Sequence, residues 1–323
     1  LSLPYVQWML VGSPLLFVYI IYTSILRGVG DSVTPLIALS LTSLIGLVVT
    51  PVLLKGYFGF PELGIIAPAV ATIMGYAAVL IFLAFYLNYK NHPLKIDRQL
   101  IRSIRHDPNL SKLILKLGIP TGVQMVTTSL AGLVIIGLVN RYGAHATAAY
   151  GAVNQVLNYI QFPAMSISIA ASIFAAQAIG AGKSDLLAKV TRTALGMNIL
   201  FTGTLITLAY LFSKYLMALF ITDHSVVVLG QQLLFIVLWS ILFFGASAIF
   251  ASIMRASGTV NVPMMINILT ILLIEVPCAY WFSSTWGLNG IWTAYALAFV
   301  CLCIFQASYY QFVWKKRDIK RLI

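Results

Sequence analysis

Long uncharged, mostly apolar runs set the strongest limit on what this chain can fold into. The run from Pro4 to Leu26 is one of several that reach 18 residues or more, and about 20 such residues in an α-helix cross the ~30 Å hydrocarbon core of a bilayer. Only 9% of the 323 residues are charged, against about 25% in soluble domains. The sequence therefore predicts an all-α polytopic membrane protein.

Polar breaks divide the chain into nine predicted transmembrane helices. In chain order they cover residues 4–26, 34–54, 65–88, 113–139, 147–179, 192–213, 227–254, 262–282 and 288–313. The fifth contains Pro163, which removes a helix hydrogen bond, so a kink is expected there.

Basic residues fall very unequally on the two sides that these helices define. Only Lys55, Arg141 and Lys214 fall on one side, and the other 17 of the 20 Lys and Arg residues fall on the opposite side. By the positive-inside rule the basic side is cytoplasmic. The C-terminus is then cytoplasmic and residue 1 lies at the outer face of the plasma membrane, the inner membrane of a bacterium. The membrane thus accounts for the net charge of +12, and no nucleic-acid partner is expected.

Residues that support metal binding or covalent catalysis are few and scattered. Cys278, Cys301 and Cys303 lie in apolar segments, where neither a disulfide framework nor a metal site is indicated. All four histidines lie in predicted loops, whereas an intramembrane enzyme needs clustered catalytic groups at membrane depth. Residues 180–183 (GAGK) resemble part of a phosphate loop but follow no strand. We therefore expect no enzymatic activity, metal or cofactor.

A charged stretch separates the third predicted helix from the fourth. Residues 89–112 carry Leu100, Ile101 and Ile104 at helical spacing between charged side chains. This pattern is typical of a short amphipathic helix on the inner membrane surface, and a solvated loop is the alternative. The predicted organisation is three helices in residues 1–89, a cytoplasmic linker in 90–112, and six helices with a basic tail in 113–323.

An internal repeat joins two distant parts of the sequence. Residues 21–35 (IYTSILRGVGDSVTP) match residues 249–263 (IFASIMRASGTVNVP) at six of fifteen positions, with an offset of 228. In both copies a helix ends in Arg, a short Gly-containing turn follows, and Pro opens the next helix, where its missing N–H costs nothing. We interpret these residues as structural turns: Arg27, Gly28, Gly30, Asp31 and Pro35 in the first copy, and Arg255, Gly258 and Pro263 in the second.

The spacing of the two copies predicts the architecture. Six predicted helices separate them, and an even number preserves orientation, as in the parallel repeats of some secondary transporters. If helices one to three match seven to nine, helices four to six match three helices upstream of Leu1. A chain that begins with Leu rather than Met fits this expectation. The intact protein is then expected to have twelve helices in two six-helix lobes.

The same segments carry a family resemblance. Residues 26–35 (LRGVGDSVTP) resemble a turn of the multidrug and toxic compound extrusion (MATE) transporters, and residues 116–124, 148–183 and 253–263 are similar to later helices of that family. The resemblance runs from the fourth to the twelfth family helix. It implies antiport, in which an inward H⁺ or Na⁺ gradient drives export of small organic, often cationic, compounds by alternating access of two lobes.

Among the eight acidic residues, Glu275 alone falls within a predicted helix. It lies about twelve residues after Pro263, near the bilayer midplane, and ionisable residues inside a membrane are functional candidates. One interpretation is a carboxylate that takes up and releases a proton and so couples H⁺ movement to substrate release. The other is a neutral side chain hydrogen-bonded between helices beside Pro277.

The family resemblance does not itself place a coupling carboxylate at Glu275. Many MATE proteins carry an acidic residue in the first helix, and some carry a Glu in the seventh, where residues 126–129 read VTTS. An Asn and an Asp-Pro pair are common in the fifth helix of some members, and this chain has Gly46 and Thr50-Pro51 instead. The main cation site is therefore expected upstream of residue 1 or in an unusual position.

Polar side chains inside apolar helices mark the predicted substrate path. Asn154, Asn158 and Gln161 are spaced i, i+4 and i+7 and share one helix face. The candidates for substrate or cation binding are Glu275, Gln124, Thr127, Thr128, Asn154, Gln155, Asn158, Gln161, Gln177 and Asn267. For any single one of them, hydrogen bonding between helices is the competing interpretation.

Two other transport functions are compatible with a two-lobe membrane protein. A flippase for a lipid-linked saccharide usually lines its cavity with several Arg and Lys residues, which are essentially absent from the predicted helices here. A channel is disfavoured by the parallel repeat and by the lack of a filter-like loop. The leading prediction is a MATE-type antiporter that acts as a monomer in membrane lipid on a small organic substrate.

Overall fold

The computed structural model describes residues 3–59, 61–92, 94–95 and 107–317. Within them, nine helical segments are long and apolar enough to cross a membrane: Leu3–Gly28, Val33–Lys55, Gly64–Tyr89, Pro108–Tyr142, Ala144–Gly180, Leu186–Leu211, His224–Ala256, Asn261–Trp286 and Leu288–Lys316. Each overlaps one predicted helix, and the described part of the chain contains no strand. The prediction of an all-α polytopic membrane protein is confirmed.

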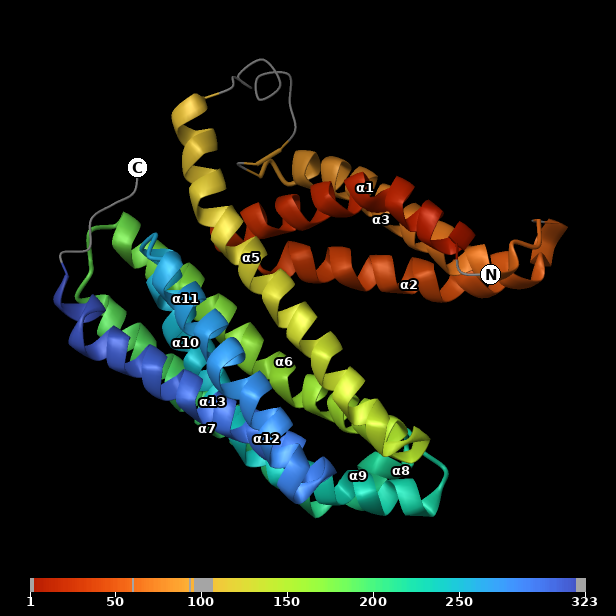
Figure 1. Cartoon of the computed structure of the whole chain (residues 1–323). Coiled ribbons are helices and arrows are strands. Elements are labelled where there is room, and N and C mark those ends of the chain that lie inside the picture. The colour runs from red at the N-terminus through yellow and green to blue at the C-terminus, as the bar shows by residue number, and fades with distance from the viewer. Residues whose placement is uncertain (1–2, 60, 93, 96–106, 318–323) are drawn as a thin grey trace. The chain divides into compact units, whose positions relative to one another are not determined.

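The first of two compact units, Leu1–Asp107, is built on three transmembrane helices. Helices α1 (Leu3–Gly28) and α2 (Val33–Lys55) both pack against α3 (Ala67–Tyr89), as Figure 1 shows. The 3₁₀ turns η1 (Tyr57–Gly59) and η2 (Gly64–Ile66) connect α2 to α3. The side chains that are fully buried at the centre of this unit are Leu26, Ala38, Val79, Leu83 and Leu87.

The second unit, Pro108–Ile323, contains the other six candidate spans. Its elements in chain order are α5 (Pro108–Val139), η3 (Asn140–Tyr142), α6 (Ala144–Gly180), α7 (Leu186–Leu211), α8 (Ser213–Ala218), α9 (His224–Val237), η4 (Leu238–Ser240), α10 (Ile241–Ala256), α11 (Asn261–Thr270), η5 (Ile271–Glu275), α12 (Val276–Trp286), α13 (Leu288–Phe312) and η6 (Trp314–Lys316).

Helix α10 lies at the centre of the second unit. It packs against α6, α7 and α13, and its residues Ile249 and Ile253 are fully buried. Gly245 allows this close packing, because a Cβ there would collide with the side chains of Asn198 from α7 and Ala164 from α6. A small residue at this crossing therefore lets three helices meet.

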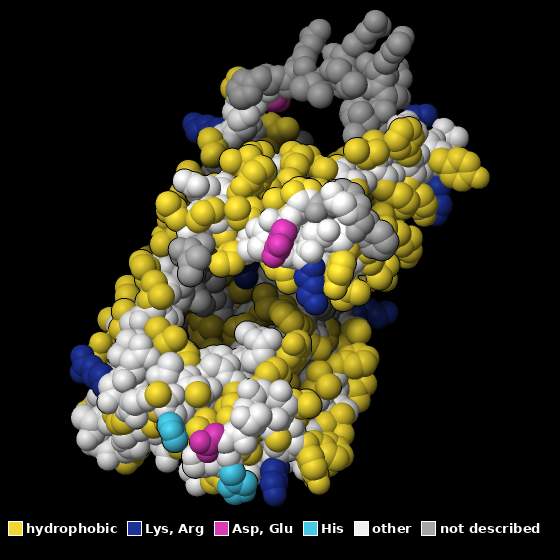
Figure 2. All heavy atoms as spheres, turned by 90° about the vertical axis from the view of Figure 1, so that its right-hand side faces the viewer, with side chains coloured by type: hydrophobic (Ala, Val, Ile, Leu, Met, Phe, Trp, Pro, Cys, Tyr) yellow, Lys and Arg dark blue, Asp and Glu magenta, His cyan; other side chains and the backbone are white. Residues whose placement is uncertain are grey.

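Large apolar side chains cover the sides of the helices. Figure 2 shows them over much of the face in view, and examples are Leu47, Phe85 and Leu133, of which 74%, 74% and 66% are exposed. In water such extensive apolar patches signal an interaction surface. Here they match the lipid-facing surface expected of a membrane-spanning bundle.

The two copies of the internal repeat form the same turn. At the end of α1, the Gly30 N–H donates to the Arg27 carbonyl and the Asp31 N–H to the Leu26 carbonyl, both at 3.0 Å. At the end of α10, the corresponding bonds run from Gly258 to Arg255 at 2.9 Å and from Thr259 to Met254 at 3.1 Å. These pairs define a Schellman motif. Every partner is displaced by the same 228 residues, so the repeat seen in the sequence is also a repeat of backbone hydrogen bonds.

Positive backbone φ angles explain why glycine occupies these turns. Gly30 has φ 94° and Gly258 has φ 80°, a region that residues with a Cβ rarely adopt. Two more helix ends use the same bonding pattern: α3, where Asn91 has φ 48°, and α6, where Gly182 has φ 72°. All four ends lie on the side that the basic residues predict to be cytoplasmic.

The predicted linker falls at the junction of the two units, after Asp107. Its proposed amphipathic residues Leu100, Ile101 and Ile104 lie outside the described residues, as do Lys320 and Arg321 of the basic tail. The division into residues 1–89, 90–112 and 113–323 remains a prediction.

Two irregular turns interrupt the predicted helices. The seventh span contains the 3₁₀ turn η4 between α9 and α10, and the eighth contains the π-helical turn η5 between α11 and α12. Helix α6 runs from Ala144 to Gly180 as one helix that includes Pro163. Apolar periodicity does not reveal such turns, because they change the hydrogen-bond register and not the polarity of the sequence.

Candidate functional site

Glu275 ends the irregular turn in the middle of the eighth span. In η5 the Val276 N–H donates to the Ile271 carbonyl, five residues back instead of four. Pro277 follows and has no N–H with which to continue ordinary helical bonding. Wide turns of this kind inside α-helices occur frequently at functional sites. The turn sets where the Glu275 carboxyl group lies within the span.

An electrostatic interaction links this carboxyl group to a group of aromatic residues on two other helices. The charge of Glu275 acts on Tyr295 of α13, and the Tyr295 hydroxyl lies 3.2 Å from the Tyr150 hydroxyl of α6. The ring of Trp292 packs against both tyrosines, with centroids 5.3 Å from Tyr150 and 5.6 Å from Tyr295. The four residues form one group, which we call the Glu275 cluster.

The Glu275 cluster contains polar groups with unused bonding capacity. Among the described residues, Glu275 has no hydrogen bond or ion pair. Trp292 is fully buried, yet its Nε1 has no hydrogen-bond partner in the described part of the chain. Buried donors are nearly always paired with protein or water. The cluster can therefore accept a proton, an ion or an ordered water molecule.

Five predicted binding residues lie on α6, which also supplies Tyr150. Asn154 Nδ2 donates to the Tyr150 carbonyl at 3.1 Å, so part of its bonding capacity serves its own helix. Within the second unit, Asn154 and Gln161 are partly buried, and the other three are exposed: Gln155, Asn158 and Gln177. The helix thus links the Glu275 cluster directly to the predicted polar face.

The remaining predicted binding residues lie on α5 and α11, which pack against each other. The hydroxyls of Thr127 and Thr128 donate to the carbonyls one turn earlier on α5, those of Val123 and Gln124, at 2.9 and 3.0 Å. On α11, the buried Oδ1 atom of Asn267 has no hydrogen-bond partner among the described residues. Asn267 therefore has free capacity for a ligand.

The turn residues of the repeat bond locally. Arg27 donates to the Ser24 hydroxyl at 3.1 Å, and Arg255 Nε donates to the Ala251 carbonyl at 3.3 Å. Pro35 and Pro263 are both buried at the start of the following helix. These contacts fit the interpretation as structural turns.

Asp31 ties the first turn to a later segment of the same unit. Its Oδ1 atom accepts hydrogen bonds from the Val33 and Thr34 N–H groups at 3.1 and 3.0 Å, and its Oδ2 atom lies 3.7 Å from Nε2 of His92. Partial burial acts to raise the pKa of Asp31, but the hydrogen bonds from Thr34 and Val33 and the nearby His92 outweigh it and lower the pKa. The carboxylate therefore caps α2 and holds the chain after α3.

Sequence reasoning missed a polar group between α7 and α10. Asn198 is fully buried, donates to the Leu242 carbonyl at 3.1 Å and accepts from the Thr202 hydroxyl at 3.0 Å. The signal was present as an Asn followed four residues later by a Thr in an otherwise apolar span. The amide nitrogen and the amide oxygen of Asn198 each have a hydrogen-bond partner, so the role of Asn198 is structural.

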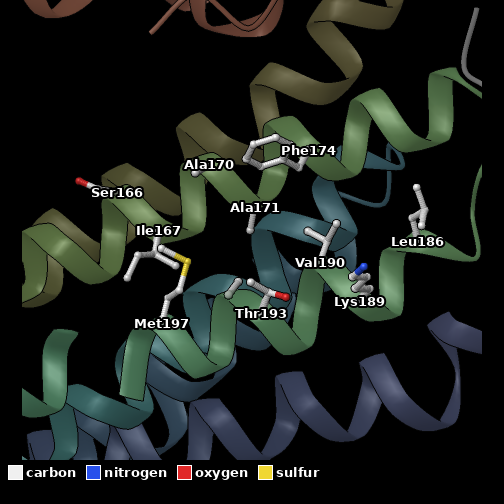
Figure 3. Close-up of a pocket in the computed structure, with 11 residues that line it drawn as sticks. Ser166, Ile167, Ala170, Ala171, Phe174, Leu186, Lys189, Val190, Thr193 and Met197 are labelled. Atoms are coloured by element: carbon white, nitrogen blue, oxygen red, sulfur yellow. The ribbon is translucent and has the colours of Figure 1, made fainter. Parts of the chain in front are cut away.

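A cavity of about 590 Å³ lies between α6 and α7. Ile167 and Phe174 of α6 face Met197 and Val190 of α7 across it, and Lys189 lies toward one end, as Figure 3 shows. None of the predicted binding residues lines this cavity. Its lining is almost wholly apolar, which suits a hydrocarbon chain better than a charged ligand.

The cysteines and other potential metal ligands form no site in the described residues. All three cysteines, Cys278, Cys301 and Cys303, are free thiols. The described residues contain no group of three or more His, Cys, Asp or Glu side chains that is placed to hold a metal ion.

Comparison with known proteins gives a consistent result. A family model described as MatE matches residues 120–281. Over its whole length the chain is 43% identical to the probable multidrug resistance protein YoeA of Bacillus subtilis (strain 168) and covers 70% of that protein. It is 28% identical over 96% of its length to a second probable multidrug resistance protein of that organism, YpnP, of which it covers 68%.

A solved structure shares the fold. The crystal structure of a MATE protein in the straight conformation superimposes with a TM-score of 0.87 at 18% identity, and the match covers 98% of this chain and 69% of the other. At this level of identity the likeness concerns the arrangement of helices alone.

Proposed function

The chain belongs to the MatE family of membrane transporters, and on this premise we propose that it exports small organic, often cationic, compounds in exchange for H⁺ or Na⁺. Family membership places it among transport proteins and not among enzymes. Its relatives are named as multidrug resistance proteins, which supports a drug-like substrate. Export proceeds by alternating access, in which the binding site opens to one side of the membrane at a time.

The observation that carries the proposal is the position of Glu275. Of the acidic residues that the structure describes, it alone lies inside a candidate span, without a neutralising cation among the described residues. An unpaired charge at membrane depth is costly, so such residues persist where they serve transport. A carboxylate that alternates between a bound H⁺ or Na⁺ and the free state supplies the coupling step.

The neighbours of Glu275 fit this role. Tyr295, on which the charge of Glu275 acts, pairs its hydroxyl with that of Tyr150, and the N–H of the adjacent Trp292 is a donor without a partner in the described residues. In the proposed cycle the carboxylate gains a hydrogen-bond partner, from these groups or from water, when it releases its cation. Coupling then changes the hydrogen bonds of Tyr150, which lies on the same helix as the predicted polar face.

We place the organic substrate along the polar residues of α5, α6 and α11. Asn158 and Gln155 are exposed on α6 within the second unit, and Asn267 has a buried acceptor with no partner among the described residues. Neutral amide groups bind the polar parts of a cation without the desolvation cost of burying several charges. Basic residues on this path would repel a cation, and none of the predicted binding residues is basic.

The orientation in the plasma membrane follows from the charge bias. Seventeen of the 20 Lys and Arg residues fall on the side that we assign to the cytoplasm, together with the C-terminus. The four Schellman turns described above lie on this same side.

Ethidium efflux from drug-sensitive bacteria that express the protein tests the function. We expect efflux to stop when one of the two ion gradients, H⁺ or Na⁺, is collapsed. The gradient whose loss stops efflux identifies the coupling ion. The Glu275→Gln variant, of similar size but unable to ionise, is expected to lose gradient-driven efflux. The matched control is Glu62→Gln, which removes an exposed carboxylate outside the spans.

Each outcome decides one part of the proposal. Normal efflux by Glu275→Gln rejects Glu275 as the coupling group but leaves drug export standing. Efflux that persists without either ion gradient rejects antiport. If the unaltered protein exports neither ethidium nor other organic cations, drug export is rejected. The alternative function, a flippase for a lipid-linked saccharide, is then favoured.

A further inference from the structure

We propose that the groove between α7 and α13 binds an anionic phospholipid, with the headgroup held by Arg192 and Lys315 and an acyl chain lying along the groove. This site is separate from the Glu275 cluster and does not depend on the proposed antiport. All residues of this site belong to the second unit.

The groove exists because α7 and α13 pack against a common neighbour. Both contact α10, and Phe250 of α10 lines the space between them. The hydroxyls of Thr191 on α7 and Tyr310 on α13 lie 2.7 Å apart and join the two helices at one level. The remaining space has a volume of about 540 Å³, within the range of about 300–1,000 Å³ that small-molecule sites occupy.

The wall that α7 contributes is apolar and open. Leu195 and Ile199 line it at a spacing of four residues, with Gly196 between them. A Cβ at Gly196 would meet nothing within 4 Å, and 61% of the Ile199 side chain is exposed. On a membrane-spanning helix such an apolar surface contacts lipid acyl chains. An acyl chain fits along Leu195, Gly196 and Ile199, none of which carries a polar side-chain atom.

The charges at one end of the groove are complementary to a phosphate. Arg192 of α7 and Lys315 of η6 both line the groove. An adjoining cavity of about 360 Å³ shares Lys315 and adds Arg317, Ser184 and Asp185. The three cations Arg192, Lys315 and Arg317 outnumber the one carboxylate, Asp185, so this end of the groove carries a net positive charge.

The position of these charges selects a lipid over a soluble anion. The cations stand where the apolar groove meets the basic side of the protein, so headgroup and chain sites are continuous. Basic pockets between transmembrane helices on the cytoplasmic side are typical binding sites for anionic lipid headgroups. A free phosphate would satisfy the cations but leave the apolar groove empty.

Thermal unfolding of the purified protein in detergent tests the site. Phosphatidylglycerol is expected to raise Tm more than phosphatidylcholine with the same acyl chains, and inorganic phosphate is expected to have no comparable effect. Native mass spectrometry of the same samples should show bound phosphatidylglycerol. Arg192→Gln and Lys315→Gln should each weaken this binding about fivefold, since a basic residue near an anionic lipid surface contributes ~1 kcal/mol.

Two further variants separate the lipid site from general surface charge. Lys189→Gln removes a cation from the same helix, but Lys189 lines the cavity between α6 and α7 and not this groove, so binding should be unchanged. Gly196→Leu keeps every charge and fills the apolar wall, so phosphatidylglycerol binding should be lost. The proposal is overturned if Lys189→Gln weakens binding as much as Arg192→Gln, if Gly196→Leu binds normally, or if phosphate alone reproduces the stabilisation.

Discussion

The hydroxyl oxygens of Tyr150 and Tyr295 lie 3.2 Å apart and join α6 to α13 beside the carboxyl group of Glu275. The contact spans 145 residues of sequence. It connects the acidic residue inside a span to α6, the helix that carries the predicted polar face of Asn154, Asn158 and Gln161. Binding or release of a cation by Glu275 can therefore alter the Tyr150–Tyr295 hydrogen bond and, through it, the helix that carries the proposed substrate path.

Removing the Tyr295 hydroxyl should weaken coupling without abolishing the fold. Tyr295→Phe deletes one interhelical hydrogen bond, for which ~0.6 kcal/mol is typical in membranes, so we expect gradient-driven ethidium efflux to fall about threefold. Tyr210→Phe is the control, because the Tyr210 hydroxyl bonds the Phe235 carbonyl between α7 and α9. Equal losses in both variants would indicate a general packing effect.

The first turn of α13 should not tolerate a side chain at Gly290. A Cβ there would collide with the Phe282 carbonyl group, which belongs to the backbone and cannot rotate away. We expect Gly290→Ala to destabilise the protein by about 1–3 kcal/mol, measured as a lower Tm in detergent. Gly151→Ala on α6, where a Cβ meets nothing within 4 Å, should leave Tm unchanged or raise it. A Gly290→Ala protein as stable as the unaltered one contradicts the close approach.

Asn198 should be indispensable for the packing of α7 on α10. Asn198→Leu keeps the branched shape of the side chain but leaves the Leu242 carbonyl and the buried Thr202 hydroxyl without the Asn198 amide as partner. An unsatisfied buried polar group costs about 1–3 kcal/mol, so Tm should fall clearly. Thr204→Val, which removes an exposed hydroxyl bonded only to its own helix, serves as the comparison and should have little effect.

The stabilising contribution of Asp31 should disappear in acid. Its pKa in the folded protein is lowered from the usual value of 3.8, so the ionised form favours folding. This contribution is complete above the unfolded-state pKa and is lost as the pH falls through the lower folded-state pKa. The unaltered protein should therefore melt above Asp31→Asn at pH 6, and the gap should close toward pH 3. A gap that stays constant over this range would argue against the Asp31 carboxylate as the source of the stabilisation.

A membrane-impermeant maleimide tests the proposed orientation. In a protein with its three natural cysteines replaced, Thr222→Cys lies between α8 and α9 on the side assigned to the exterior, and Lys183→Cys lies between α6 and α7 on the other side. Intact cells should label only the first, and permeabilised cells should label both. Labelling of Lys183→Cys alone in intact cells would invert the topology.

The sequence predicted the transmembrane helices well because their signal is simple. Each of the nine candidate spans in the described residues overlaps a predicted one, since a bilayer demands a continuous apolar length and tolerates few charges. The repeat was equally visible, because Gly30 and Gly258 satisfy the same local requirement for a positive φ. Membership in the family was predicted from these segments and is confirmed by the comparisons.

Features that depend on tertiary contacts were not visible in the sequence. Gly64 and Gly290 each precede an isoleucine, yet Gly64 has a positive φ of 50° and Gly290 permits a close backbone approach. The Tyr150–Tyr295 contact joins residues of unremarkable spacing, and the buried network of Asn198 looked like any isolated polar residue. Apolar runs in the sequence indicate which segments contact lipid, but not which polar groups contact one another inside the helix bundle.

The wide turn at Ile271–Glu275 also has a consequence for how this protein is compared with its relatives. Such a turn accommodates one residue more than an α-helix of the same rise. A relative in which this segment is a regular helix will therefore align only with a single-residue gap in the middle of a membrane span, where insertions are otherwise rare. Scanning alignments for that gap would separate members that keep an acid on the wide turn from those that straightened the helix and lost it.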